Sequence, residues 1–392
     1  MKDQRFNGKK ILIFEGGARQ SLPFMRAFKK FGCKVTVLCN SKLDVSFVSR
    51  LPDKKILINC KEGDYVGFEK RFLDIINQEQ FDVIVPMSDF AATILSNNKE
   101  VLDGKTNAIC SSNKIIHKAL DKMNVMDVCQ KNGLPCPKTL LSAEKIEDVL
   151  NGGLTFPVLI KPRAQSGARG LRVFSDEEEL IDFTKTNKLI FSDYVIQEYI
   201  PNVKRCYSSN LYVDKNGRIV SNFVYQSARW FPVFGGTGTL NISVFNKQII
   251  EYSKELISIF GLRGCCGVDF IEDPRDGKIK ILEINPRPLA CAKIEFLSGI
   301  NVAKQILEDT FLESVTSYDT YKTGVRVRMS QIDFLWFLKS PNRFKAKPCY
   351  FSILHTKDQL FAIDDPLPWF AFLFSGIKKY KKQIGRKSKF RS

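Results

Sequence analysis

The sequence predicts an α/β protein with more than one domain. Three observations lead to this prediction: a strand–helix–strand opening at the N-terminus, two apolar runs that flank a cluster of turn formers near residue 276, and a change of composition from about residue 310. With 392 residues, 44% hydrophobic and 26% charged, the chain has the composition of an ordinary globular protein and room for two or three cores.

The N-terminal segment is typical of a doubly wound sheet. Residues 9–14 predict a buried strand, residues 22–31 a helix and residues 33–38 a second strand. Residues 81–86 predict another strand, which ends where such a sheet places groups that contact a ligand. The glycine pair within residues 15–18 lacks the full dinucleotide fingerprint, so a purely structural turn is the favoured interpretation.

The middle of the chain alternates helical and strand patterns. Residues 113–131 predict a helix, residues 155–160 and 193–202 predict strands, and residues 211–224 predict a hairpin around Asp214-Lys-Asn-Gly217. Beyond about residue 310 the chain becomes rich in aromatic and basic residues.

A second hairpin carries the strongest functional signal. Its two apolar runs flank the turn formers 273–277, so we expect antiparallel strands centred near Asp276. In that hairpin Asp269 lies opposite Glu283, and Asn285 points to the same face because side chains alternate with period two. Opposed carboxylates repel, and oxygen ligands of this kind suit magnesium, with manganese as a second choice. The alternative is a solvated acidic hairpin.

A small-residue loop follows Lys161 and predicts a phosphate contact. The loop contains Ser166, Gly167, Ala168, Arg169 and Gly170. Its backbone N–H groups could surround phosphate oxygens, while Lys161 supplies a compact positive charge. It is not a Walker loop, because no Gly-Lys-Ser or Gly-Lys-Thr follows. A plain hairpin turn is the alternative.

These motifs occur in a specific order along the chain. The five are Asp121-Lys122, Pro157–Lys161 with its glycine loop, Val195–Ile200, Val268-Asp269-Phe270 and Leu282–Arg287. Together they resemble the ATP-grasp superfamily, as in biotin carboxylase, carbamoyl phosphate synthetase and D-alanine–D-alanine ligase. The resemblance covers about residues 9–305.

The resemblance implies a domain plan. It consists of an N-terminal Rossmann-like pre-ATP-grasp domain at residues 1–112, an α+β ATP-grasp domain at residues 113–310 and a C-terminal aromatic and basic extension at residues 311–392. The lobes 113–200 and 201–310 would clamp ATP between them.

The resemblance also implies roles for the nucleotide-binding residues. Lys122 and Lys161 would contact the ATP phosphates or the adenine edge, and residues 166–170 would form a mobile loop over the phosphates. The hinge that reads adenine would consist of Gln197, Glu198 and Ile200. One departure concerns the ribose, because the chain has Pro201-Asn-Val-Lys-Arg-Cys206 where family members often carry a Pro-Gly-x-Glu pattern.

The remaining site residues would act on the transferred phosphoryl group. Asp269, Glu283 and Asn285 would hold magnesium, and Arg287 would steady the phosphoryl group, so Arg287 and Lys161 are the catalytic candidates. Phosphoryl transfer needs cations and positioned donors more than a covalent nucleophile. With only two histidines in the chain, histidine-based zinc or triad chemistry is disfavoured.

A loop between the nucleotide motifs is the candidate substrate site. Its candidate residues are Arg229, Trp230, Gly235, Gly236 and Thr237. The segment resembles the loop that closes over the acceptor in related ligases. Arg229 could pair with a substrate carboxylate in bidentate fashion, with Trp230 walling the pocket. The alternative is a surface hairpin with a stacked arginine and tryptophan.

Superfamily chemistry then implies an enzyme, a carboxylate–amine ligase. A carboxylate would attack the terminal phosphoryl of ATP, and an amine would open the acylphosphate to an amide with release of ADP and phosphate. The alternatives are a kinase that phosphorylates one substrate, and a non-catalytic ATP-binding protein with a regulatory or membrane-associated role.

The charge distribution suggests an anionic partner. The net charge is +18, and its densest part is the acid-free stretch from Gly376 to Arg391, which follows the aromatic run 366–377. Such a tail, residues 366–392, suits an anionic membrane surface and a lipid-linked sugar acid or surface-polymer precursor. Packing of the aromatic run onto the protein is the alternative. No nucleic-acid-binding module accompanies the cluster.

Cysteine content and the start of the chain bear on localisation. Eleven cysteines without metal-like clustering fit free thiols in a reducing compartment. The first ten residues do not resemble a signal peptide, and no apolar run reaches about 18 residues, so we expect a cytoplasmic protein, with peripheral attachment to the inner face of the membrane as an open alternative. A homo-oligomer is compatible with the sequence.

Overall fold

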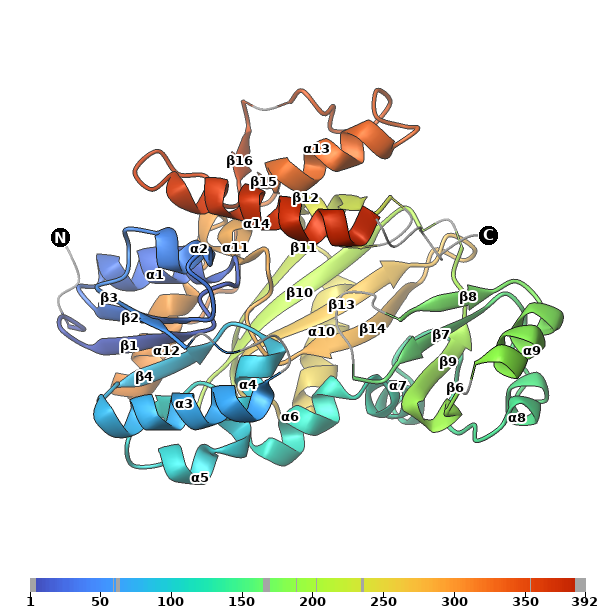
Figure 1. The fold of residues 1–392 in the computed structure, drawn as a ribbon, viewed down its shortest axis with the longest axis horizontal. Coiled ribbons are helices and arrows are strands. Elements are labelled where there is room, and N and C mark those ends of the chain that lie inside the picture. Colours follow the sequence, from blue (N-terminus) through green and yellow to red (C-terminus); the bar gives the residue numbers. More distant parts are fainter. Residues whose placement is uncertain are drawn as a thin grey trace.

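The computed structural model contains three β-sheets with helices packed around them (Figure 1). It describes residues 5–58, 60, 64–164, 170–187, 189–201, 203–233, 236–352 and 354–384. Five of the predicted site residues lie outside these ranges, namely Ser166, Gly167, Ala168, Arg169 and Gly235.

The first sheet is parallel and doubly wound, with strand order β3-β2-β1-β4-β5. Its strands are β1 (Lys10–Phe14), β2 (Lys34–Cys39), β3 (Lys54–Leu57), β4 (Val83–Pro86) and β5 (Asn107–Ala108). The accompanying helices are α1 (Ser21–Lys30), α2 (Val45–Val48), α3 (Tyr65–Gln78), α4 (Asp89–Asn97) and α5 (Lys99–Leu102). A Cβ at Gly16 would lie 2.5 Å from Cys39 Sγ, so close packing of the turn after β1 requires glycine there. The predicted α/β class and its Rossmann-like opening are confirmed.

The second sheet is antiparallel, with order β6-β9-β7-β8. Helices α6 (Asn113–Leu120) and α7 (Lys122–Lys131) lead into it. Its elements are β6 (Thr139–Leu140), α8 (Ile146–Leu150), β7 (Val158–Pro162), β8 (Arg172–Phe174), α9 (Glu177–Thr186), the short helix Phe191–Asp193 and β9 (Tyr194–Glu198). Val158, Ile160, Phe174 and Leu180 form a small core of its own. The predicted phosphate loop connects β7 to β8 in this sheet.

The third sheet has the order β14-β13-β10-β11-β12-β15-β16. Its strands are β10 (Cys206–Val213), β11 (Ile219–Phe231), β12 (Thr237–Ser243), β13 (Gly264–Glu272), β14 (Ile279–Asn285), β15 (Arg326–Arg328) and β16 (Thr356–Asp358). Helices α10 (Lys247–Phe260), α11 (Ala292–Leu297), α12 (Val302–Phe311) and α13 (Ser330–Lys339) pack around it. Both predicted hairpins are present, because β10 pairs with β11 and β13 pairs with β14.

The third sheet and the first sheet share one hydrophobic core. Ile13 and Phe28 from the N-terminal part belong to the same buried cluster as Phe223 and Leu307. The carboxyl ends of the parallel strands are therefore fixed against the segment that follows β14. Asp89 follows β4 and Arg287 follows β14, so these two parts of the candidate site lie together.

The C-terminal extension contributes structure to this body. It supplies β15 and β16 to the third sheet and ends in α14 (Leu367–Ile384), which lies beside α2 (Figure 1). Trp369 and Phe372 pack against the shared core, whereas Leu367, Phe370 and Phe374 are 54%, 45% and 58% exposed. Part of the aromatic run thus packs onto the protein and part faces outward. In the part of the chain that the structure describes, no helix is long and apolar enough to cross a membrane.

Candidate nucleotide and metal site

The hairpin β13–β14 brings the predicted metal ligands together. Asp269 pairs with Glu283 in the strand register, as the sequence predicts. Asp269 accepts hydrogen bonds from Ser208 Oγ at 2.5 Å and from Asn285 Nδ2 at 2.9 Å. Burial and the nearby Glu283 carboxylate raise the pKa of Asp269 to about 6. The two carboxylates and the amide therefore occupy one face of the hairpin, with an unfavourable interaction between the carboxylates.

These side chains fit a hard divalent cation. Among the described residues no group of three His, Cys, Asp or Glu side chains could hold a metal ion, and the candidate set here is two carboxylates with the amide of Asn285. Asn285 Oδ1 accepts from Arg287 Nη2 at 2.9 Å and keeps a second lone pair. An all-oxygen set with two facing carboxylates suits magnesium, since the cation would relieve their repulsion.

Two lysines approach the Glu283 carboxylate, one from α7 and one from β7. Lys122, the first residue of α7, places Nζ 3.4 Å from Glu283 Oε2. Lys161 on β7 is 9% exposed, and burial lowers its pKa to about 8, although Glu283 counteracts this. A helix packed on the third sheet and a strand of the second sheet thus each bring a cation to this acid, an arrangement that suits charged phosphate oxygens.

Arg287 connects the site to the N-terminal sheet. Its Nε donates to Asp89 Oδ1 at 3.0 Å. Asp89 opens α4 directly after β4, where the sequence predicts ligand-contacting groups. The pairing holds the guanidinium beside Asn285, whose Oδ1 accepts from Arg287 Nη2.

The predicted hinge residues differ in what they can contact. Gln197 Oε1 is buried and has no hydrogen-bond partner among the described residues, and Ile200 is buried. Glu198 instead accepts from Lys280 Nζ at 2.8 Å and from the backbone N–H of Lys138 at 2.9 Å. Its carboxylate is occupied by these donors, so the Glu198 backbone is the part that stays a candidate for an adenine contact.

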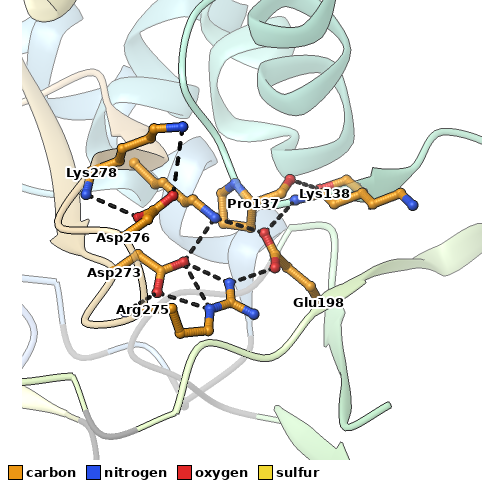
Figure 2. Close-up of polar contacts among 9 residues, drawn as sticks. Pro137, Lys138, Glu198, Asp273, Arg275, Asp276 and Lys278 are labelled. Atoms are coloured by element: carbon orange, nitrogen blue, oxygen red, sulfur yellow. Dashed lines mark hydrogen bonds and ion pairs between the residues drawn. The ribbon is translucent and has the colours of Figure 1, made fainter. Parts of the chain in front are cut away.

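An ionic cluster surrounds Glu198 and joins the two lobes. Figure 2 shows Arg275 between Glu198 and Asp273, with Nη2 2.5 Å from Glu198 Oε2 and 2.6 Å from Asp273 Oδ2. Lys280 Nζ also lies 2.9 Å from Asp273 Oδ2. The cluster ties β9 to the β13–β14 hairpin and fixes the hinge relative to the metal candidates.

The structure corrects the expectation for Arg229. This side chain is 4% exposed and forms a bidentate pair with Asp333, with Nε–Oδ1 and Nη2–Oδ2 distances of 2.9 and 2.8 Å. It lies over the ring of Trp336, 4.9 Å from its centroid. Because Asp333 occupies the bidentate edge of the guanidinium and the Pro348 carbonyl oxygen accepts from Nη1 at 3.0 Å, Arg229 anchors α13 and is not available to a substrate carboxylate.

The other residues of that loop are less constrained. Trp230 is partly buried on β11. Thr237 is the first residue of β12. A Cβ at Gly236 would lie 2.4 Å from the Phe231 carbonyl oxygen, so glycine is required there for packing. Sequence reasoning missed Ser208, which contacts Asp269 from a neighbouring strand, since no local pattern marks it.

The family comparison decides what this site belongs to. Residues 119–291 match the model of the ATP-grasp domain family. The chain carries an ATP-grasp domain. All of the metal, lysine and hinge candidates lie within the matched residues, including Arg287. The suspected resemblance is therefore confirmed.

Relatives of the ATP-grasp chain include two ligase-type proteins. It is 24% identical over 261 residues to D-aspartate ligase of Enterococcus faecium, a match that covers 62% of each chain. It is 24% identical over 345 residues to the carbamoyl phosphate synthase large chain of Clostridium beijerinckii, with 81% of this chain and 31% of that protein covered. The chain thus spans less than two thirds of the length of either relative.

Solved structures show the same fold. The biotin carboxylase domain of Hydrogenobacter thermophilus 2-oxoglutarate carboxylase, a complex with MgADP and bicarbonate, has a TM-score of 0.66 at 18% identity and matches 81% of this chain and 73% of that one. The ADP complex of N5-carboxyaminoimidazole synthetase from Staphylococcus aureus has a TM-score of 0.62 at 18% identity, covering 83% and 82%. The ATP-grasp fold is confirmed.

Proposed function

We propose that the protein is an ATP-dependent carboxylate–amine ligase that forms an amide through an acylphosphate. One observation carries the proposal: Lys122 and Lys161 lie near Glu283, Glu283 faces Asp269 across the hairpin, and Arg287 follows the same hairpin. This set supplies cations for phosphate oxygens and oxygen ligands for a metal, and it contains no covalent nucleophile. Such a set suits transfer of a phosphoryl group to a carboxylate.

ATP and magnesium, or manganese, are the proposed cofactors. Asp269, Glu283 and Asn285 would hold the ion, which neutralises phosphate charge when bound. Lys122 and Lys161 would bind phosphate oxygens. Gly170 closes the predicted phosphate loop with φ of 71°, a left-handed conformation that suits glycine.

The adenine contact is proposed for the hinge. A buried amide oxygen without a partner is costly, so Gln197 Oε1 should accept a hydrogen bond from a ligand donor such as the adenine amino group. The hinge backbone around Ile200 would complete the contact. Glu198 would position the hinge through its ionic cluster.

The names of the relatives support the ligase class and direct the choice of substrates. D-Aspartate ligase suggests amino acids with a second carboxylate as the first acids to test. The amine is tested by a matrix that includes amino sugars, amino acids and simple amines.

The decisive experiment measures ADP and phosphate release with ATP and Mg²⁺ across this matrix, with hydroxylamine as a trap. Release that requires a particular carboxylate, together with a hydroxamate in the trap, would support acylphosphate chemistry. A stable phosphorylated product without an amine would instead favour a kinase. ATP binding without release under any combination would reject the ligase proposal in favour of a non-catalytic ATP-binding protein.

We also propose that the C-terminal helix brings the enzyme to an anionic membrane, where a lipid-linked sugar acid or surface-polymer precursor would be its substrate. Leu367, Phe370 and Phe374 lie three and four positions apart on α14 and are exposed. The sequence of the same helix continues with Lys378, Lys379, Lys381 and Lys382. Exposed aromatics next to cations suit a headgroup interface. The proposed location is then the cytoplasmic face of the membrane.

Vesicle sedimentation tests the membrane proposal. The variant Phe370→Ser/Phe374→Ser should lose binding to phosphatidylglycerol vesicles that the wild-type protein binds, and neither should bind phosphatidylcholine. A matched control is Phe245→Ser, which removes an aromatic side chain that is 65% exposed elsewhere on the surface. Equal bound fractions for all three proteins would reject the proposal.

A further inference from the structure

Arg19 lies at the carboxyl edge of the parallel sheet, in the turn between β1 and α1. The next residue, Gln20, fixes this turn because its side-chain amide donates to the carbonyl oxygens of Met87 and Pro288, the latter at 3.3 Å. Met87 follows β4, and Pro288 follows the candidate catalytic residue Arg287. The turn is thus tied to both sides of the candidate site.

In the part of the chain that the structure describes, the groups close to Arg19 include no carboxylate that balances its charge. Its Nη1 donates to Met329 Sδ, and the groups near enough to act on its pKa are Cys291, Tyr225 and Arg287. Burial raises the pKa of the Cys291 thiol to about 12 and that of the Tyr225 hydroxyl well above its usual value, so both are neutral at physiological pH. Among the described residues no carboxylate forms an ion pair with Arg19.

Two other arginines in this region have their charge compensated by an aspartate. Arg287 pairs with Asp89, and Arg229 pairs with Asp333. A guanidinium stays charged at any physiological pH, and enclosing it without a counter-charge is costly. Burial accordingly lowers the pKa of Arg19. Its side chain is nevertheless only partly buried, so a small anion could reach it.

Arg19 is also close to the phosphoryl end of the site. Tyr225 on β11 is near enough to Asp269, Cys291 and Arg287 for each to act on its pKa. Tyr225 pairs with Ser208 in the strand register, and Ser208 donates to Asp269. Gln20, the residue after Arg19, contacts the carbonyl oxygen of Pro288, which follows Arg287, so an anion held by Arg19 would lie on the Arg287 side of the site.

We propose that Arg19 is a substrate-binding residue that takes a carboxylate of the substrate acid. The identity of the anion rests on the proposed ligase function, whereas the existence of an anion site rests on the uncompensated guanidinium. Arg19 would replace Arg229 in the role that the sequence suggested, since a bidentate arginine–carboxylate pair requires a guanidinium with no other carboxylate partner.

The test compares the full-length wild-type protein with Arg19→Met and with the matched variant Arg229→Met. Without added ligand, Arg19→Met should melt at a higher temperature than wild type because it removes an uncompensated cation. Arg229→Met should melt at a lower temperature because it leaves Asp333 buried and unpaired. If Arg19→Met were destabilised like Arg229→Met, Arg19 would be structural and the inference would fail.

Binding is measured by thermal shift with D-aspartate, L-aspartate and malonate as probes, against sodium chloride at equal ionic strength. We expect Arg19→Met to lose at least roughly tenfold in apparent affinity for the probe that stabilises wild type. It should bind a fluorescent ATP analogue as wild type does. Unchanged probe affinity in Arg19→Met, or no stabilisation of wild type by any probe, would overturn the carboxylate assignment. Binding through Arg19 without ADP release would support the inference while rejecting the ligase proposal.

Discussion

Glu295→Gln should stabilise the protein at pH 8 and have little effect at pH 5. Glu295 on α11 is 3% exposed, and Asn210 Nδ2 donates to its carboxylate at 2.9 Å. The other polar atom of that amide, Asn210 Oδ1, is buried without a partner among the described residues. A glutamine could accept from Asn210 Nδ2 and donate to Asn210 Oδ1, so it would satisfy both atoms.

The magnitude follows from the pKa. Burial raises the pKa of Glu295 from its ordinary 4.5 to about 7. Between these values the folded protein holds a proton that the unfolded chain releases, so stability falls as pH rises from about 4.5 to about 7. At about 1.4 kcal/mol for each pKa unit, the full loss is about 3 kcal/mol. Glutamine does not ionise, so the variant should not lose it.

The assay is denaturation of wild type, Glu295→Gln and the exposed control Glu178→Gln at pH 5 and pH 8, followed by circular dichroism. The pH-dependent loss of stability should be smaller in Glu295→Gln alone. The reasoning would be refuted if Glu295→Gln kept the wild-type pH dependence, or if it were less stable than wild type at both pH values. The first result would mean that the folded structure compensates the ionised carboxylate, and the second that glutamine does not form the expected pair with Asn210.

Three further predictions concern the site and its anchor. Glu283→Gln should keep the fold and reduce ATP turnover by orders of magnitude, because one metal ligand loses its charge; turnover and circular dichroism check this. ATP affinity should fall as pH rises through about 8, since Lys161 then loses its proton, and Lys161→Arg should bind ATP independently of pH over this range when measured by calorimetry. Arg229→Ala should lower the free energy of unfolding by about 3 to 5 kcal/mol in urea titrations, because it leaves Asp333 unpaired.

Each of these has a control in the same chain. Glu272→Gln changes a carboxylate on the neighbouring strand β13 that pairs with Arg205 instead, and it should leave turnover intact. An ATP affinity that stayed constant to pH 9 in wild type would contradict the Lys161 assignment. The double variant Arg229→Met/Asp333→Leu should recover part of the stability lost in Arg229→Ala, and a further loss would show that the pair itself is not the cause.

The parts of the site that could be predicted from sequence are those fixed by local geometry. The turn formers 273–277 and the period of a strand were sufficient to place Asp269 opposite Glu283, and the register confirms it. Long-range pairing could not be predicted in this way. Asp333 lies 104 residues from Arg229 and reaches it only because α13 packs on β11. Arg229, which the sequence suggested as a free cation for a substrate carboxylate, is therefore paired within the protein.

The hinge illustrates the same limit. Glu198 and Gln197 are neighbours on β9, and alternation of side chains places them on opposite faces. Sequence alone does not say which face meets Lys280 and which is left with an unpartnered oxygen. The N-terminal turn is a further case, because nothing near Arg19 in the sequence indicates that, among the described residues, no carboxylate pairs with it.

The way the C-terminal segment completes the third sheet has a practical consequence for shortening the chain. Residues 326–328 pair with β12, and residues 356–358 pair with them in turn (Figure 1). A fragment cut at residue 310, where the composition changes, would uncover the backbone of β12 over Leu240, Asn241 and Ile242. Uncovered strand edges recruit other chains. Such a fragment should aggregate during purification, whereas one that ends after residue 358 keeps β12 covered.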